Sequence, residues 1–159
     1  MIWPLLPTDA GTLRDMFRRM SAQSQQRRFL GPLDDLDDAM IQRLVGDVDG
    51  VHHVALLLVV LPPDGPEQVA GVARLMQNPA DPGTAEIAFA VADEWQGRGA
   101  GTALVKALLQ RRPAGVRRLR ATVDSANRAS FALLAGAGRM SSGLASLGVV
   151  DVTVELAAA

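Results

Sequence analysis

The chain has no cysteine and no tyrosine among its 159 residues. Without cysteine it has no disulfide, no thiolate metal ligand and no cysteine nucleophile. Without tyrosine, one common general acid is missing from any active site that it forms. An excess of one charge is also lacking, since 16 Lys and Arg residues against 17 Asp and Glu residues give a net charge of -1. No overall basic field therefore points to nucleic acid as a partner.

Long hydrophobic runs are absent as well. The longest, residues 54–61, is far shorter than the roughly 20 apolar residues that span a bilayer. The amino terminus has neither the basic region nor the long apolar region of a signal peptide. His52 and His53 are adjacent, so on a strand they would point to opposite faces, which suits shared metal ligation poorly. We therefore expect a cytoplasmic protein with no membrane partner and no metal.

Apolar residues make up 48% of the chain, enough to bury a sizeable core. The length fits one domain, residues 1–159, without an internal repeat or an inter-domain linker. Thr8 or Asp9 is the expected cap of the first helix, and Gly31-Pro32 is the expected break before the second. Hydrophobic periodicity predicts strands at 2–6, 51–61, 68–76, 84–91, 117–123 and 149–156. It also predicts four helices: one that follows residue 9, one that starts at residue 34, one over 100–111 and one over 127–135. This order indicates one mixed α/β domain.

A glycine-rich turn, Gln96-Gly97-Arg98-Gly99-Ala100-Gly101-Thr102, lies between a predicted strand and a predicted helix. The first N–H groups of a helix have no internal partner, and the helix dipole makes that end positive, so such a turn can bind an anion. Glycines let the backbone approach a phosphate closely, and Arg98 between two of them can hold one through two hydrogen bonds. The turn therefore predicts a phosphate-binding site.

Two well-known phosphate-binding loops fit this turn poorly. A Walker loop ends in Gly-Lys-Ser/Thr, and Gly101-Thr102 lacks the lysine. The dinucleotide fingerprint needs glycine or alanine where Thr102 stands, although Asp124 mimics its ribose-binding acid. The predicted strand also ends near Val91, several residues before the turn, and the chain after Asp124 is too short for a Rossmann half. A tight strand-to-helix turn without a ligand is the remaining alternative.

The turn and its flanks resemble the Gln/Arg-x-x-Gly-x-Gly/Ala motif of the GCN5-related N-acetyltransferase (GNAT) family. The spacer Asp93-Glu94-Trp95 and the later Asn127 match that family too, and the resemblance covers nearly the whole chain. It implies the GNAT acyl-CoA N-acyltransferase fold, a central, mostly antiparallel twisted sheet flanked by helices. It also implies an enzyme that uses acetyl-CoA as co-substrate.

The resemblance assigns the cofactor contacts residue by residue. The strand before the turn would line the acetyl group and the pantetheine arm, and the turn would hold the pyrophosphate with Arg98 assisting. Asn127 would contact the arm, a role compatible with capping its helix. The expected cofactor-binding residues are Phe89, Ala90, Val91, Gln96, Gly97, Arg98, Gly99, Ala100, Gly101, Thr102, Asn127 and Ser130.

Two segments narrow the resemblance to the bacterial Pat-like protein lysine acetyltransferases. One is residues 21–32, with its serines and its Arg-Phe-Leu-Gly-Pro run, and the other is residues 81–89. Members of that branch often carry a nucleotide-binding domain or a synthetase-like domain, for which this chain has no room. We therefore expect a Pat-like catalytic domain without a regulatory domain.

Acetyl transfer needs a neutral amine, because an ammonium group has no lone pair, and a lysine amine is almost wholly protonated at neutral pH. The Pat-like branch places its proposed base glutamate at the position of Glu86, which we expect to be the catalytic residue. Its neighbours Ala85, Ile87 and Ala88 are apolar, and partial burial among them would make the carboxylate a better proton acceptor. A solvated side chain or an ion pair with an arginine is the alternative role.

The expected donor to the oxyanion is a backbone N–H near Ala90 or Val91. Many relatives protonate the CoA thiolate with a tyrosine seven positions after the asparagine, and here that position is Leu134. The acid is then water, Ser130 or no group at all, because a thiolate leaves readily. Gly138-Arg139 stands where the family often has Gly-Phe, a second departure, on the acceptor side.

The sequence leaves open which partners the protein binds. A basic cluster can meet the 3′-phosphate of CoA or an acidic partner, or form a solvated face; its members are Arg111, Arg112, Arg117, Arg118 and Arg120. We expect the acceptor to be a primary amine, first a protein lysine and second a small-molecule amine. A non-catalytic acyl-CoA-binding module is the alternative that the missing tyrosine favours, and a homodimer is left open.

Overall fold

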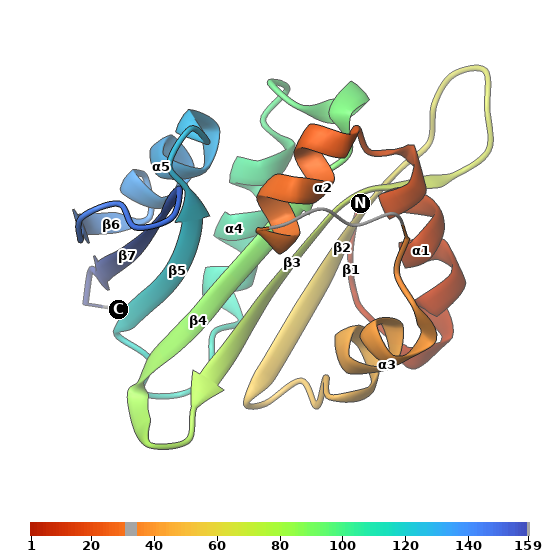
Figure 1. The fold of residues 1–159 in the computed structure, drawn as a ribbon. Helices are drawn as coiled ribbons and strands as arrows, with labels where there is room; N and C mark the ends of the chain where they lie inside the picture. The colour runs from red at the N-terminus through yellow and green to blue at the C-terminus, as the bar shows by residue number, and fades with distance from the viewer. Residues whose placement is uncertain (31–34, 159) are drawn as a thin grey trace.

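The computed structural model describes residues 1–30 and 35–158. These residues form one sheet of seven strands in the order β1-β2-β3-β4-β5-β7-β6, with helices packed against it (Figure 1). The strands are β1 (Ile2–Pro4), β2 (His53–Val60), β3 (Gln68–Asn78), β4 (Asp81–Val91), β5 (Arg118–Asp124), β6 (Gly138–Ser142) and β7 (Val149–Leu156). The helices are α1 (Ala10–Arg19), α2 (Ala22–Phe29), α3 (Asp38–Gly46), α4 (Ala100–Gln110) and α5 (Arg128–Ala135), with short 3-10 turns η1 (Pro7–Asp9) and η2 (Asp93–Trp95). The expected mixed α/β fold is confirmed.

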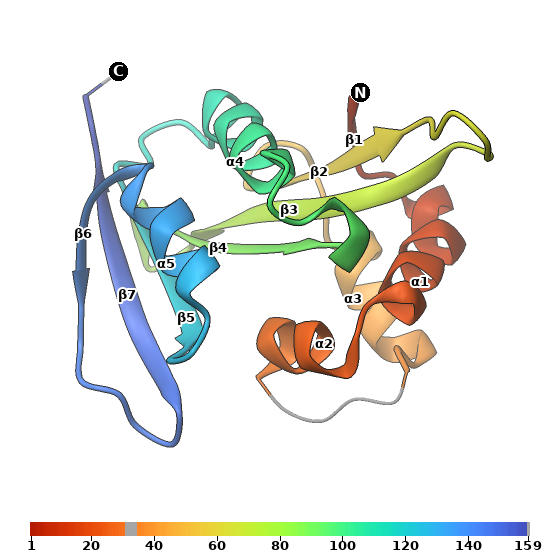
Figure 2. The same ribbon diagram turned by 90° about the horizontal axis from the view of Figure 1, so that it is seen from above.

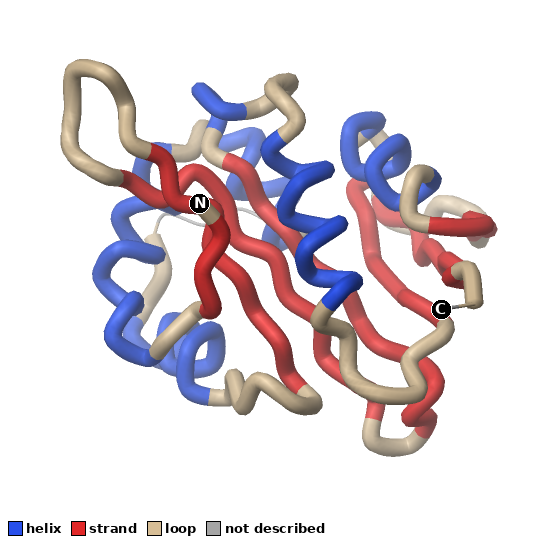
Figure 3. The backbone as a smooth tube through the Cα atoms, turned by 180° about the vertical axis from the view of Figure 1, so that it is seen from behind, coloured by secondary structure: helices blue, strands red, loops and turns tan. Residues whose placement is uncertain are grey.

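Helices cover both faces of the sheet. The helices α4 and α5 lie on one face, and α1, α2 and α3 lie on the other (Figure 2). Seen from behind, α4 lies across the central strands (Figure 3). Each face has its own apolar core, one built around Leu104 and Leu108 of α4 and the other around Leu13 and Met16 of α1.

The strand β2 shows why the sequence has a near-continuous apolar run at 54–61. Val54 and Leu56 point into the core under α4, whereas Ala55 and Leu57 point into the core under α1. A strand covered on both faces has no solvent side, so apolar and polar residues do not alternate along it.

The one parallel pair in the sheet, β4 with β5, is short. It runs only from Thr84 opposite Arg118 to Glu86 opposite Arg120. On its other side β4 pairs with β3 without interruption as far as Val91. On its other edge, β5 pairs with β7 along its whole length, from Arg118 to Asp124. The sheet therefore opens between β4 and β5, close to the glycine-rich turn that follows η2.

The sequence patterns did not predict one helix and one strand of the structure. The polar segment 21–30 contains α2, and Ser21 caps this helix by accepting the N–H of Ser24 at 3.2 Å. Its only large apolar residue is Phe29, so it shows no apolar periodicity. The strand β6 was also missed: it begins at Gly138, just beyond the helix expected over 127–135, and pairs with β7.

The expected helix starts are confirmed in part. Asp9 is the N-cap residue of α1, as expected, but its carboxylate makes no hydrogen bond to that helix and instead accepts the N–H of Leu6 at 2.7 Å. The second helix was expected from residue 34, but α3 begins at Asp38 after the cap Asp37, which accepts the N–H of Met40 at 2.7 Å. The expected break at 31–32 lies outside the described residues.

The two histidines lie in different surroundings. His53 is buried, with its Nδ1 3.0 Å from the carbonyl of Asp47, while His52 is exposed. Across residues 1–30 and 35–158, no three His, Cys, Asp or Glu side chains gather closely enough to hold a metal ion. In the same ranges no helix has the length and apolar character to cross a membrane.

Gly138 should not tolerate a side chain. A Cβ at this position would collide with the carbonyl oxygen of Glu155 in β7, which is backbone and cannot move aside cheaply. We expect Gly138→Ala to lower the free energy of unfolding by about 1–3 kcal/mol, measured by urea denaturation. Gly143→Ala is the matched control, since its nearest contact would be 3.9 Å away. Equal stability of the two variants would contradict this packing.

Candidate active site

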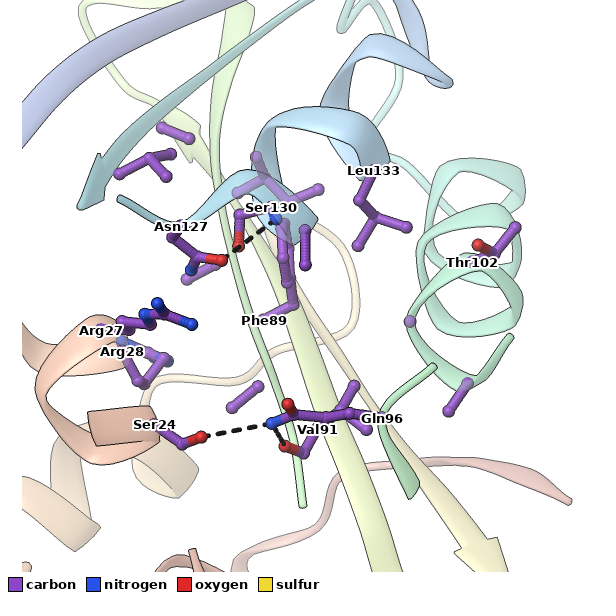
Figure 4. Close-up of a pocket in the computed structure, with 18 of the residues that line it drawn as sticks. Ser24, Arg27, Arg28, Phe89, Val91, Gln96, Thr102, Asn127, Ser130 and Leu133 are labelled. Carbon is purple, nitrogen blue, oxygen red and sulfur yellow. Dashed lines mark hydrogen bonds between the residues drawn. The ribbon is translucent and has the colours of Figure 1, made fainter. Parts of the chain in front are cut away.

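A cavity of about 290 Å³ lies where β4 and β5 separate (Figure 4). The end of β4 lies on one side of it and residues 121–123 of β5 on the other. The turn before α4, the start of α5 and one side of α2 complete the lining. Segments from both faces of the sheet thus meet at the opening between the two strands.

The glycine-rich turn forms one end of this cavity. Gly97 has φ 70° and Gly99 has φ 81°, left-handed values that favour glycine. A Cβ at either residue would meet nothing within 4 Å, so the backbone faces open space. Gly99 is the N-cap of α4, and the first N–H groups of that helix have no partner within it. The turn therefore offers the positive, unobstructed backbone that an anion needs.

The backbone of β4 presents polar groups to the gap. The N–H of Ala92 donates to the carbonyl of Ala70 in β3 at 2.8 Å. In an antiparallel pair, alternate residues direct both backbone groups to the same neighbour. Ala90 therefore faces β3, while Phe89 and Val91 direct their N–H and carbonyl groups toward β5, which is no longer paired there. Of the two N–H donors expected from the sequence, only that of Val91 faces the gap.

A polar clamp ties α2 to the end of β4. Gln96 donates from Nε2 to the carbonyl of Val91 at 2.9 Å and to the Ser24 hydroxyl at 3.2 Å (Figure 4). The Asp93 carboxylate accepts the N–H of Ser21 at 3.0 Å and the hydroxyl of Ser24 at 3.1 Å. The side chains of Ser24, Asp93 and Gln96 hold α2 against the turn, so that one side of the helix forms a wall of the cavity.

Asn127 begins α5 at the same cavity. Its Oδ1 accepts the N–H of Ser130 at 3.2 Å, the hydrogen bond of a helix cap (Figure 4). Both residues line the cavity. The capping role is therefore present, and the same side chain is placed where a ligand can reach it.

Eleven of the twelve expected cofactor-binding residues line the cavity. They are Phe89, Ala90, Val91, Gln96, Gly97, Gly99, Ala100, Gly101, Thr102, Asn127 and Ser130. Arg98 is absent from the lining, and its guanidinium lies over the Trp95 ring, 5.2 Å from the centroid. Glu86 is also outside the lining, and its side chain is exposed, so the partial burial expected for it is wrong.

Sequence reasoning missed the part of the lining that α2 supplies. Ser24, Arg27 and Arg28 come from this helix, and Met20 precedes it. Ser24 lies three residues before Arg27 and four before Arg28, the spacing of neighbours on one helix face. This spacing is visible in the sequence, but it places the three residues on one face only if the segment is a helix.

Two guanidinium groups are buried beside α2. Arg74 of β3 is 6% exposed and donates to the carbonyl of Leu44 at 2.7 Å. Burial, and then the charge of Arg28, lowers the pKa of Arg74 to about 10, and the charge of Asp47 only partly opposes this. Burial lowers the pKa of Arg28 to about 10 as well. Both side chains therefore keep their charge at neutral pH in surroundings that disfavour it.

The Asp93 clamp should weaken in acid. Burial acts to raise the pKa of Asp93, but the hydrogen bonds from Ser21 and Ser24 outweigh it and hold that pKa below the ordinary value. A carboxyl with a lowered folded pKa contributes stability above its unfolded pKa and loses it as pH falls through the folded pKa. We expect the stability difference between the wild type and Asp93→Asn to stay constant above about pH 5 and to shrink as the pH falls below about 4.

Urea denaturation at each pH measures this difference. Asp64→Asn is the control, because Asp64 is exposed in the loop between β2 and β3. A difference for Asp93→Asn that stays constant across the pH range would contradict the clamp.

Comparison with known proteins identifies the family. The model of the acetyltransferase (GNAT) family matches residues 18–138, more than half of the chain. Acetyltransferase PA5475 of Pseudomonas aeruginosa is 29% identical over 130 residues, which cover 81% of this chain and 68% of that protein.

Solved structures agree with this match. The GNAT domain of S. lividans PAT is 27% identical, with a TM-score of 0.81 over 98% of this chain and 89% of that one. The protein yncA of Salmonella typhimurium, solved with its cofactor acetyl-CoA, shares the fold at 17% identity, with a TM-score of 0.68 over 99% and 94% of the two chains. The chain therefore belongs to the acetyltransferase (GNAT) family and is an acetyl-CoA-dependent N-acetyltransferase.

Proposed function

We propose that this enzyme transfers the acetyl group of acetyl-CoA to a protein lysine, with Glu86 as the general base. The observation that carries the proposal is the opening between β4 and β5, which brings the glycine-rich turn and the backbone N–H of Val91 to one cavity. Similarity to the GNAT domain of S. lividans PAT, at 27% identity, supports a Pat-like acceptor.

The cavity lining fits acetyl-CoA. Gly97 and Gly99 leave open space beside N–H groups at a helix start, where a pyrophosphate would be held. Phe89 and Val91 offer backbone groups to the pantetheine arm, which would lie along the unpaired edge of β4, and Asn127 faces it from α5. Arg98 would have to leave the Trp95 ring to assist, so the backbone is the main holder of the phosphates in this proposal.

Bound acetyl-CoA supplies a thioester whose carbonyl carbon accepts the amine. The amine nitrogen forms a C–N bond to that carbon as the C–S bond breaks, giving an acetamide and CoA thiol. The N–H of Val91 would stabilise negative charge on the carbonyl oxygen. The proton released by the amine passes to Glu86, and Ser130 or water in the cavity supplies the proton that the sulfur takes up.

Glu86 would act on the α2 side of the sheet. Side chains alternate along a strand, so Glu86 shares a face with Ala88 and Ala90, the face that α2 covers. It lies about 10 Å along the strand from Phe89 and is exposed, so water would carry the proton between the amine and the carboxylate.

The leaving thiolate has no tyrosine to protonate it. Leu134 occupies the position where relatives often carry that tyrosine, and it is completely buried in the core under α4 and α5. Ser130 lines the cavity and has a hydroxyl, so it or water would supply the proton. A thiol of ordinary pKa near 8.5 leaves readily as thiolate, and the cost of a missing acid is therefore small.

Two alternatives have distinct signatures. A small-molecule amine in place of lysine would give CoA release with free amines and none with peptides. A non-catalytic acyl-CoA-binding module would bind acetyl-CoA and release no thiol with any acceptor. A screen of lysine peptides and small amines together, followed by thiol release, separates the three.

The turn gives a direct test of cofactor binding. Gly99→Glu places a carboxylate in the open space of the turn and forces a side chain into a left-handed backbone. We expect calorimetry to detect no acetyl-CoA binding to this variant while its fold is retained. Gly50→Glu is the matched control, since Gly50 has φ 74° and open space but lies before β2. Undiminished acetyl-CoA binding by Gly99→Glu would show that the phosphates do not bind at this turn.

The base is tested by the pH dependence of turnover. Glu86→Gln keeps the size of the side chain and cannot accept the proton, so we expect kcat to fall by about 10²-fold or more at neutral pH. The loss should shrink as pH rises and the amine deprotonates by itself. Glu67→Gln, exposed in the loop before β3, should keep the wild-type rate. An unchanged rate for Glu86→Gln at every pH would reject Glu86 as the base.

A further inference from the structure

The α2 wall of the cavity carries two adjacent arginines. Arg27 and Arg28 both line the cavity, and the Arg27 side chain extends from α2 toward its interior (Figure 4). Because the two residues lie one helical turn beyond Ser24, they are farther along α2 from the clamp at Gln96. They are therefore separate from the end of the cavity where the glycine-rich turn binds anions.

The direction of α2 places these arginines on the acceptor side. Ser24 contacts Gln96 beyond the end of β4, whereas Arg27 and Arg28 lie on the side of Ser24 away from Gln96 and Val91 (Figure 4). Following α2 from Ser24 to Arg28 thus leads back along β4 from its end toward Glu86. The two arginines lie between the glycine-rich turn and the proposed base, on the face where an amine would enter.

These arginines differ from others on the same side of the molecule. Arg14, Arg18 and Arg19 each form a salt bridge with a carboxylate. Arg27 and Arg28 form no salt bridge with any residue in the ranges 1–30 and 35–158. The chain therefore keeps positive charge beside the cavity without an acidic partner from the described residues.

The Arg28 nitrogen is a second, independent sign of a ligand. Its Nε is buried and, within the described part of the chain, has no hydrogen-bond partner. Its guanidinium lies over the Phe29 ring, 5.0 Å from the centroid, which fixes its position without satisfying its N–H groups. Buried Arg74 next to it adds charge of the same sign. A buried N–H without a partner is costly unless a bound acceptor satisfies it.

We propose that Arg27 and Arg28 bind an anionic group, a carboxylate or phosphate, carried by the acceptor next to its reactive amine. The inference rests on the proposed function and adds the chemical class of the acceptor. A guanidinium binds such a group through paired hydrogen bonds, and this would orient the amine toward the acetyl group. A lysine with an acidic neighbour and a small amine that bears a carboxylate share this chemistry.

Acceptor pairs that differ only in charge test the proposal. One pair is a short lysine peptide with glutamate beside the lysine and the same peptide with glutamine. The other is γ-aminobutyrate and its uncharged amide. We expect kcat/KM from CoA release to be at least about tenfold higher for the charged member of the peptide pair, of the small-amine pair, or of both. The pair with the larger ratio identifies the source of the anion.

Variants assign the effect to the arginines. Arg28→Gln and Arg27→Gln should reduce the charged-to-neutral ratio to near one, while Arg28→Lys should retain part of it. Arg43→Gln, on the exposed side of α3, is the control and should keep the ratio. Removing a buried, unpaired charge should leave the melting temperature unchanged or raise it. A fall in stability with equal loss for both members of a pair would give Arg28 a structural role and overturn the proposal.

A binding measurement separates this proposal from the reaction itself. The acetylated peptide products are titrated into the CoA-loaded protein, which needs no turnover. Tighter binding of the glutamate product than of the glutamine product, with the difference lost in Arg28→Gln, supports the anion site. It does so even if no acceptor leads to release of CoA, because the missing release would reject only the acetyl transfer proposed above. Equal binding of the two products overturns the anion site. A tenfold loss of acetyl-CoA affinity in Arg28→Gln would also overturn it, because the arginine would then bind the cofactor.

Discussion

Beyond Glu86, β4 keeps its pairing with β3 and loses its pairing with β5, and the site is arranged around the backbone that this separation exposes. The N–H groups of Phe89 and Val91 and the carbonyl of Phe89 are left without a strand partner, while the Val91 carbonyl accepts the Gln96 side chain instead. Such groups are costly inside a folded protein unless a ligand or water pairs with them. The separation also opens a passage between the two faces of the sheet, so a ligand at the glycine-rich turn and one beside α2 can meet.

The two walls of this passage are held in different ways. The wall at the turn is set by backbone conformation, since Gly97 and Gly99 adopt left-handed angles and point no side chain into the cavity. The wall at α2 is held by side chains, through Ser24, Asp93 and Gln96. The first arrangement suits a constant ligand such as acetyl-CoA. The second can change with the sequence of α2, and this is where the acceptor would be selected.

Most of the fold was predictable because it follows from local patterns. Alternating and apolar runs identified the long strands, and the turn chemistry identified the site around Gly99. The helix α2 was missed because its contacts are polar and come from distant residues such as Asp93. The strand β6 was missed because Gly138 has no local strand signal and is required there only by the closeness of Glu155.

The sequence by itself determined the family, the glycine-rich turn and eleven of the twelve expected residues around the cavity, because the motif encodes backbone conformation locally. Only the tertiary structure decided the rest. It placed Glu86 in solvent, Arg98 on Trp95 and Leu134 in the core. It also brought Arg27 and Arg28 to the cavity. Burial and side-chain direction depend on which elements pack together, and no spacing within one segment specifies that.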